Sequence, residues 1–316
     1  RHVLVRHEQA AVHAAEGYAR STGRLGVVLV TSGPGVGNTI TGLLDAISDS
    51  IPILCISGQV ATAVIGTQAF QECNALGLSQ PVTKWNHQPR EATRVSETVH
   101  SAIRIATSGR PGPVLIDMPK DVQLQRVAVP AAADSAAAGT GKAGSAAAET
   151  RKADQGGVGE ADRGAGFLSA RGPAQPLPAR GDLERAADLL AGARRPVLYG
   201  GGGLINSGPE ACASFTALAR AWHLPTTLTL MGLGAFPASD PRFLGMLGMH
   251  GTVEANLAMY HADLVICVGA RFDDRITGRL ADFCPQARKI HLDVCPGNIN
   301  KVVPVDVGLV GDCAPV

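Results

Sequence analysis

The sequence has few aromatic residues and no excess of either charge, and both shortages narrow the class of protein. Aromatic residues make up 4% of the 316 residues, and 28 lysines and arginines stand against 27 aspartates and glutamates. The resulting formal net charge of +1 provides no strong field to attract nucleic acid or an anionic membrane. We therefore expect a small-molecule partner, with no nucleic acid and no membrane.

The sequence also lacks a cysteine framework and any long apolar run. Its seven cysteines are scattered, odd in number and without a C-x-x-C pair, which is typical of reduced thiols and predicts a cytoplasmic location. The longest apolar runs, such as 27–30 and 264–268, have the length of strands, far below the roughly 20 residues that span a bilayer. Because the chain begins at Arg1 without methionine, we expect its natural ends, with any targeting segment, to be missing.

Apolar strand-like runs alternate with helical patterns on both sides of an Ala/Gly-rich stretch. This alternation predicts an α/β fold with two doubly wound parallel-sheet domains, at 1–129 and 181–316. Residues 130–180 have almost no large apolar side chains and are predicted to form a flexible linker. The expected strands are 3–5, 27–30, 53–57 and 114–117 in the first domain, and 196–200, 226–230, 263–268 and 289–293 in the second.

Two glycine-rich turns follow predicted strands. The turn at 200–203 would let backbone N–H groups approach a phosphate, but Ile205 breaks the G-x-G-x-x-G fingerprint, so a simple tight turn is equally supported. The turn at 31–38 lacks the Gly-Lys-Ser/Thr ending of a P-loop. Neither turn alone identifies a ligand.

Charged residues at strand ends give the remaining candidates. Glu8 stands where a strand is expected to meet a helix, a position that suits either a catalytic carboxylate or simple complementation of the helix dipole. The run from Arg271 to Arg275 follows a strand, where its arginines and aspartates suit either a phosphate and hydroxyl site or a solvated salt-bridge loop. No Ser-His-Asp triad or metal-spaced His/Cys cluster is recognisable, so no metal ligand is predicted.

Taken together, these segments resemble one family. Residues 6–20, 30–35, 57–59, 69–72 and 108–113 closely resemble the large catalytic subunit of acetolactate synthase, also called acetohydroxyacid synthase, a thiamine-diphosphate enzyme. Residues 199–203, 230–234, 247–251 and 269–275 resemble its central, FAD-binding domain. The resemblance implies a pyrimidine-binding first domain and a Rossmann-like second domain.

The resemblance also implies a reaction and its residues. In this family the glutamate that matches Glu8 activates thiamine diphosphate, which decarboxylates pyruvate and adds the product to a second 2-keto acid, pyruvate or 2-ketobutyrate, in branched-chain amino-acid biosynthesis. Gly35 would lie near the aminopyrimidine ring, while Phe70, Gln71 and Lys84 would line the substrate approach from the neighbouring subunit. The expected partners are therefore a second copy in a homodimer or larger homo-oligomer, and a regulatory small subunit.

A second set of residues matches family positions that hold FAD, which would perform no net redox step and act structurally. These residues are Arg110, Gly201, Gly202, Thr229, Leu230, Met231, Leu247, His250, Gly269, Arg271, Asp273, Arg275 and Asp293. The sequence departs from the family pattern at Gln68, Trp85 and Cys295, which concern substrate selection and the adenosine-side contacts of the flavin.

The family's third domain, with a Gly-Asp-Gly to Asn motif for Mg²⁺ and the diphosphate, has no match here. We therefore expect the Mg²⁺ ligands to lie outside this chain, and the chain alone to be inactive and to bind thiamine diphosphate weakly. The alternatives are another FAD-containing thiamine-diphosphate enzyme, such as pyruvate oxidase, and a non-catalytic nucleotide-binding homologue.

Overall fold

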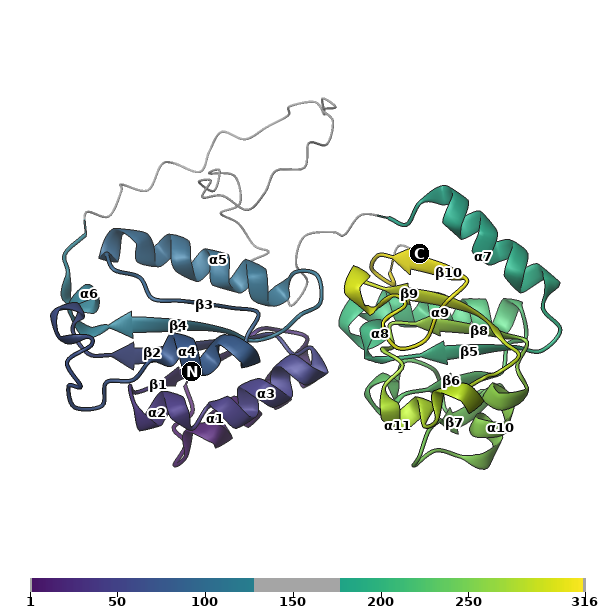
Figure 1. Ribbon diagram of the computed structural model, residues 1–316, viewed down its shortest axis with the longest axis horizontal. Coiled ribbons are helices and arrows are strands. Elements are labelled where there is room, and N and C mark those ends of the chain that lie inside the picture. Colours follow the sequence, from purple (N-terminus) through teal and green to yellow (C-terminus); the bar gives the residue numbers. More distant parts are fainter. Residues whose placement is uncertain (1, 128–176, 315–316) are drawn as a thin grey trace, which may run out of the picture.

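The computed structural model describes residues 2–127 and 177–314, which form two α/β units (Figure 1). Residues 130–176 of the predicted linker lie outside these ranges, and the helix α7 (Arg180–Gly192) begins one residue before the expected start of the second domain. Within the described residues, none of the helices has the length and apolar character needed to cross a membrane.

The first unit is a four-stranded parallel sheet with the order β1-β2-β4-β3. Its strands are β1 (Gly26–Val30), β2 (Ile53–Gln59), β3 (Trp85–His87) and β4 (Val114–Pro119). Its α-helices are α1 (Glu8–Thr22), α2 (Pro34–Gly37), α3 (Ile40–Asp49), α4 (Ala75–Ser79), α5 (Val95–Thr107) and α6 (Lys120–Leu124), and its 3-10 helices are η1 (Thr62–Val64), η2 (Gln80–Val82) and η3 (Ala92–Arg94).

Helices cover both faces of the central strands β2 and β4, which explains why these strands are nearly continuously apolar, whereas Val27 and Leu29 of the edge strand β1 stay exposed. Val12 of α1 and Leu43 of α3 pack on one face, and Ala102 and Ala106 of α5 pack on the other. In Figure 1, α1 and α3 lie on one side of the sheet and α5 on the other. Every residue of β4 is buried as a result.

The second unit is a six-stranded parallel sheet with the order β10-β9-β8-β5-β6-β7. Its strands are β5 (Pro196–Gly200), β6 (Thr226–Leu228), β7 (Phe243–Met246), β8 (Leu264–Val268), β9 (Arg288–Asp293) and β10 (Val307–Val310). Besides α7, its helices are α8 (Gly202–Ser207), α9 (Pro209–Ala221), α10 (Val253–His261), α11 (Asp274–Thr277), η4 (Leu230–Gly232), η5 (Leu280–Asp282) and η6 (Pro296–Asn298).

The strand order of the second sheet changes direction beside β5. This first strand pairs with β6 on one side and with β8 on the other, so the chain winds outward in both directions. Parallel sheets of this kind bind ligands in the crevice outside the carboxyl ends of the strands at such a switch point. The fold therefore points to the loops after β5, β6 and β8.

The predicted fold class is confirmed, with two parallel-sheet α/β domains. One expected strand was wrong: residues 3–5 form no strand, and Val3 and Leu4 are 80% and 89% exposed instead of being packed in a sheet. The edge strands β3, β7 and β10 were missed because they are only three or four residues long and incompletely buried.

Candidate functional site

The carboxylate of Glu8 is held beside the glycine-rich turn that follows β1. Glu8 is the first residue of α1, and the side-chain amide of Asn38, at the end of α2, donates to its Oε2 at 2.9 Å. This hydrogen bond is the main reason why the pKa of Glu8 lies below its ordinary value. Glu8 is therefore ionised at neutral pH, with one oxygen fixed by a neighbour.

Gly35 leaves the second oxygen of Glu8 uncovered. A Cβ at position 35 would lie 2.6 Å from Thr31 Cγ2 and 3.7 Å from Glu8 Oε1. A side chain at this position would therefore collide with Thr31 and cover the carboxylate. The structure thus brings together Glu8 and Gly35, as the sequence predicts, and adds Asn38, which sequence reasoning missed.

Gln71 belongs to the same group through its backbone, because a Cβ at Gly33 would lie 2.8 Å from the Gln71 carbonyl oxygen. Gly33 itself has a φ of 60°, in the left-handed region that favours glycine. Phe70 stands on the same loop and is 88% exposed. The loop after β2 is therefore seated on the turn after β1.

Within this chain, Lys84 lies at another edge of the sheet than Phe70 and Gln71. It precedes β3, so it lies at the amino edge of the parallel sheet, whereas the loops after β1 and β2 lie at the carboxyl edge. Its Nζ donates to the carbonyl of Ser108 at 2.7 Å and to that of Ile105, at the end of α5. Burial, with a contribution from Arg110, lowers its pKa to about 8.

A different lysine occupies the carboxyl edge. Lys120 directly follows β4, is exposed, and begins α6, which contacts η1 at the start of the loop after β2. The signal that could have found it is a lysine directly after a fully buried strand.

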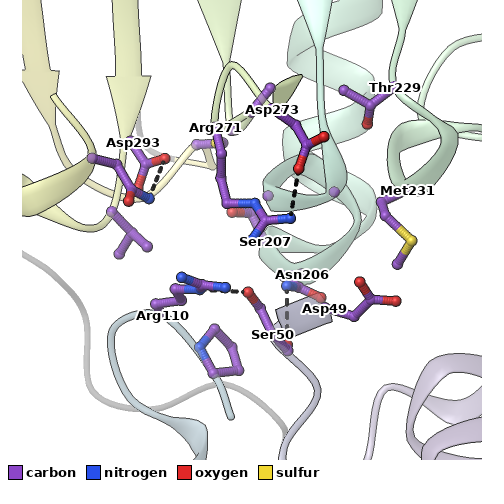
Figure 2. Close-up of a pocket in the computed structure, with 18 of the residues that line it drawn as sticks. Asp49, Ser50, Arg110, Asn206, Ser207, Thr229, Met231, Arg271, Asp273 and Asp293 are labelled. Atoms are coloured by element: carbon purple, nitrogen blue, oxygen red, sulfur yellow. Dashed lines mark hydrogen bonds and ion pairs between the residues drawn. The ribbon is translucent and has the colours of Figure 1, made fainter. Parts of the chain in front are cut away.

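A cavity of about 380 Å³ lies between the two units (Figure 2). Its first-domain wall contains residues 48–50 around the end of α3 and residues 107 and 109–111, and its second-domain wall contains the loops after β5, β6, β8 and β9. Ten of the thirteen residues matched to FAD positions line it: Arg110, Gly202, Thr229, Leu230, Met231, Gly269, Arg271, Asp273, Arg275 and Asp293. The cavity is thus at the switch point of the second sheet.

Arg110 connects this cavity to the first domain. Its Nε donates to Ser50 Oγ at 2.7 Å, and its Nη2 donates to the carbonyls of Ile47 at 3.0 Å and Ser48 at 2.9 Å. These bonds satisfy carbonyls at the end of α3 that the helix itself leaves unpaired. Asn206 reaches across from α8 to the Ser50 carbonyl at 3.4 Å (Figure 2).

Charges of both signs face the cavity from the second domain. Arg271 Nη2 lies 3.6 Å from Asp273 Oδ2, and Asp293 is the last residue of β9 (Figure 2). Asp293 accepts the N–H of Cys295 at 2.7 Å and the amide of Asn298 at 3.1 Å. Because Cys295 contributes its backbone, its departure from the family pattern leaves this contact intact.

Three of the expected residues do not line the cavity. Gly201 lies beneath its wall, where a Cβ would come 2.3 Å from the Gly269 carbonyl oxygen. Leu247 is a buried core residue, and His250 is exposed. The glycine-rich turn after β5 therefore has two roles. Gly201 allows close backbone packing, and Gly202 lines the cavity.

A carboxylate–imidazole cluster away from both sites was also missed. His13 and Glu16 of α1 and Asp45 of α3 each place a metal-ligand type of atom within 4.8 Å of the others, and His13 Nδ1 lies 2.6 Å from Glu16 Oε2. Sequence spacing could not reveal it because Asp45 comes from another helix.

Comparison with known proteins agrees with this geometry. Residues 1–78 match the family described as thiamine pyrophosphate enzyme, N-terminal TPP binding domain, and residues 183–316 match thiamine pyrophosphate enzyme, central domain. The chain is 44% identical over 316 residues to the acetolactate synthase large subunit of Haemophilus influenzae, with 100% of the chain and 49% of that protein covered.

Two further relatives are similar to the same extent. The acetolactate synthase isozyme 3 large subunit of Escherichia coli is 43% identical over 315 residues, covering 100% of the chain and 49% of that protein. The mitochondrial acetolactate synthase catalytic subunit of Saccharomyces cerevisiae is 43% identical over 321 residues, covering 98% and 43%. The chain therefore spans about half the length of these relatives. It belongs to the thiamine pyrophosphate enzymes and is similar along its whole length to acetolactate synthase large subunits.

Proposed function

We propose that this chain is the cofactor-activating and nucleotide-binding part of an acetolactate synthase large subunit. The full-length enzyme would decarboxylate pyruvate and join the product to a second 2-keto acid, pyruvate or 2-ketobutyrate. The observation that carries this proposal is the Glu8 carboxylate, which is ionised, fixed at Oε2 by Asn38 and left open at Oε1 by Gly35.

The residues of this turn fit the aminopyrimidine end of thiamine diphosphate. When bound, the cofactor supplies the nucleophilic carbon and the electron sink for decarboxylation. Glu8 would hold a proton between its Oε1 and a ring nitrogen, and Asn38 would keep the carboxylate in one orientation. Gly35 would admit the flat ring, because a side chain at this position would occupy the same space.

The cavity between the domains fits a dinucleotide such as FAD. Its arginines, Arg110, Arg271 and Arg275, suit phosphate oxygens, and its aspartates, Asp273 and Asp293, suit ribose hydroxyls. Gly202 lets the backbone of the turn after β5 approach Met231 closely, because a Cβ at position 202 would lie 3.1 Å from Met231 Cβ. We propose that FAD binds here and acts structurally.

The remaining parts of the active site are proposed to come from outside this chain. They are the Mg²⁺ and diphosphate contacts and groups from a second copy of the subunit in a homo-oligomer. A regulatory small subunit is proposed as a separate partner. Accordingly, the 316-residue chain alone should form no acetolactate.

Product analysis with flavin spectroscopy tests the proposal. The full-length protein with thiamine diphosphate, Mg²⁺, FAD and pyruvate should form acetolactate while the flavin spectrum stays oxidised. Flavin reduction by pyruvate would instead indicate an oxidase. Flavin binding without any product would indicate a non-catalytic nucleotide-binding homologue.

A further inference from the structure

One carboxylate organises the exposed loop that follows β2. Glu72 accepts the backbone N–H of Ala69 with Oε2 at 3.0 Å and that of Gly66 with Oε1. Its own N–H donates to the Ala69 carbonyl at 2.9 Å. Both oxygens of this side chain are therefore used to fold residues 66–72, which we call the Glu72 loop.

The backbone of the Glu72 loop needs such an anchor. Gln68 and Gln71 have φ values of 62° and 61°, in the left-handed region that residues with a Cβ seldom adopt. Strained conformations of this kind persist only where surrounding contacts fix them, and they gather at functional sites. The two N–H groups that donate to Glu72 belong to Gly66 and Ala69, which lie on either side of Gln68. These hydrogen bonds therefore fix the turn at Gln68 directly.

The Glu72 loop is also seated on the Glu8 turn. The Gln71 carbonyl lies against Gly33, two residues before Gly35, and the Cys73 carbonyl accepts the amide of Gln59 at 2.8 Å. Next to this seat the aromatic ring of Phe70 is 88% exposed, although a phenylalanine is usually buried. The anchored loop thus holds an exposed apolar ring next to Gln71, whose backbone lies against the Glu8 turn.

We propose that Glu72 is a positioning residue that holds Phe70 and Gln71 where a 2-keto acid approaches the Glu8 site. This inference rests on the proposed function. Glu72 touches no substrate. It acts through the loop, whose exposed ring would contact the small apolar group of the keto acid.

The test compares Glu72→Gln with Asp263→Asn in the full-length protein. Asp263 also accepts two backbone N–H groups, from Arg194 and Arg195, both at 2.8 Å, but it lies in the second domain and not in the Glu8 turn or the Glu72 loop. Glu72→Gln keeps one acceptor oxygen and places an N–H₂ against the other amide. It should raise KM for pyruvate roughly tenfold, the loss expected for one charge-assisted hydrogen bond, and change kcat little.

Two further measurements separate positioning from general stability. Amide hydrogen exchange should accelerate at Gly66 and Ala69 in Glu72→Gln and stay unchanged there in Asp263→Asn. Glu72→Asp, which keeps the charge, should restore part of the wild-type KM. Asp263→Asn should lower the melting temperature and leave KM unchanged.

Three results would overturn the inference. They are an unchanged KM in Glu72→Gln although its loop amides exchange faster, unchanged exchange at those amides, and an equal rise in KM in Asp263→Asn. In each of these cases an active wild-type protein leaves the proposed function standing. A wild-type protein that forms no acetolactate would refute the proposed function and, with it, the role of Glu72.

Discussion

The Glu8 turn and the interdomain cavity are built in different ways. At the turn, one carboxylate is fixed by one amide and bordered by one glycine, all supplied by α1 and the turn after β1. The cavity is lined by charged groups from several strand ends of one domain and by Arg110 of the other. Chemistry at the turn therefore depends on a single group, whereas binding in the cavity is shared among many.

The sharpest way to break this comparison is to remove the single carboxylate. Glu8→Gln should lower acetolactate formation by about 10²- to 10⁴-fold, the usual contribution of a positioned acid–base group, and leave the flavin content unchanged. Steady-state rates and the flavin absorbance of the purified full-length protein measure both. The control is Glu97→Gln on α5, which should keep full activity. Glu97 is exposed, and its Oε2 lies 3.6 Å from Arg94 Nη2. Equal activity in the two variants would refute the role of Glu8.

Removing one of the shared cations should have a smaller effect, on flavin affinity. Arg271→Ala should weaken FAD binding about ten- to a hundredfold, because one charge-assisted hydrogen bond contributes about 1.5–3 kcal/mol. Fluorescence titration of the apoprotein with FAD measures the change. Arg279→Ala is the matched control, since Arg279 is 81% exposed and its Nη1 lies 3.3 Å from Oδ2 of the surface residue Asp282. A loss of FAD affinity in Arg271→Ala as large as the loss of activity in Glu8→Gln would show that FAD binding depends mainly on one group.

The glycine beside the carboxylate offers a steric test of the turn. Gly35→Ala should destabilise the protein by about 1–3 kcal/mol, the usual cost of overpacking, and lower activity by crowding Glu8 Oε1. Gly37→Ala, in the same helix, should have neither effect, because a Cβ there meets no atom within 4 Å. Urea unfolding and steady-state rates of the two variants give the comparison. If both alanines were tolerated equally, the turn would be less tightly fitted than the structure indicates.

The smallest expected effect is a difference in how one carboxyl of each domain changes stability with pH. The Arg242 backbone N–H, with the Arg220 and Arg242 guanidinium groups, lowers the pKa of Asp240 in the second domain to about 2. Ionised Asp240 thus favours folding above about pH 4, and this contribution is lost as the pH falls toward 2. Asp240→Asn should flatten the melting-temperature profile in that window.

Glu16 in the first domain should respond to acid with the opposite sign. Burial raises the pKa of Glu16, so its protonation favours the folded state as the pH falls toward the ordinary range of a glutamate. Domain-resolved hydrogen exchange between pH 7 and pH 5 measures this change. Glu16→Gln should remove the contribution of this side chain to the first domain and leave the second domain unchanged.

Much of the fold could be predicted because the central strands are buried on both faces. A run such as β8 is apolar at all five positions, and its length and the flanking helical patterns identify it as a parallel strand. The edge strand β3 carries no such signal, since Trp85 and Asn86 are half-buried and His87 is exposed. Residues 3–5 are apolar like a strand, but they pair with no strand of the described residues.

The candidate site was predictable only where local sequence creates it. Glu8 and Gly35 belong to recognisable segments, so the resemblance found them. Asn38 could not be assigned because its role depends on how the turn folds back onto α1. The position of Lys84 could not be derived for a related reason: sequence does not show which edge of the sheet a side chain reaches, and Lys84 precedes its strand instead of following it.

Arg110 gives the cavity a consequence for the whole molecule. The same side chain closes the end of α3 in one domain and faces the ligand-sized space lined by the other. A ligand that fills this space is therefore thermodynamically linked to the association of the two domains, and its binding free energy is added to their cohesion. Calorimetry should then show the two domains melting in a single cooperative transition when the cavity is filled, and in separate transitions when it is empty.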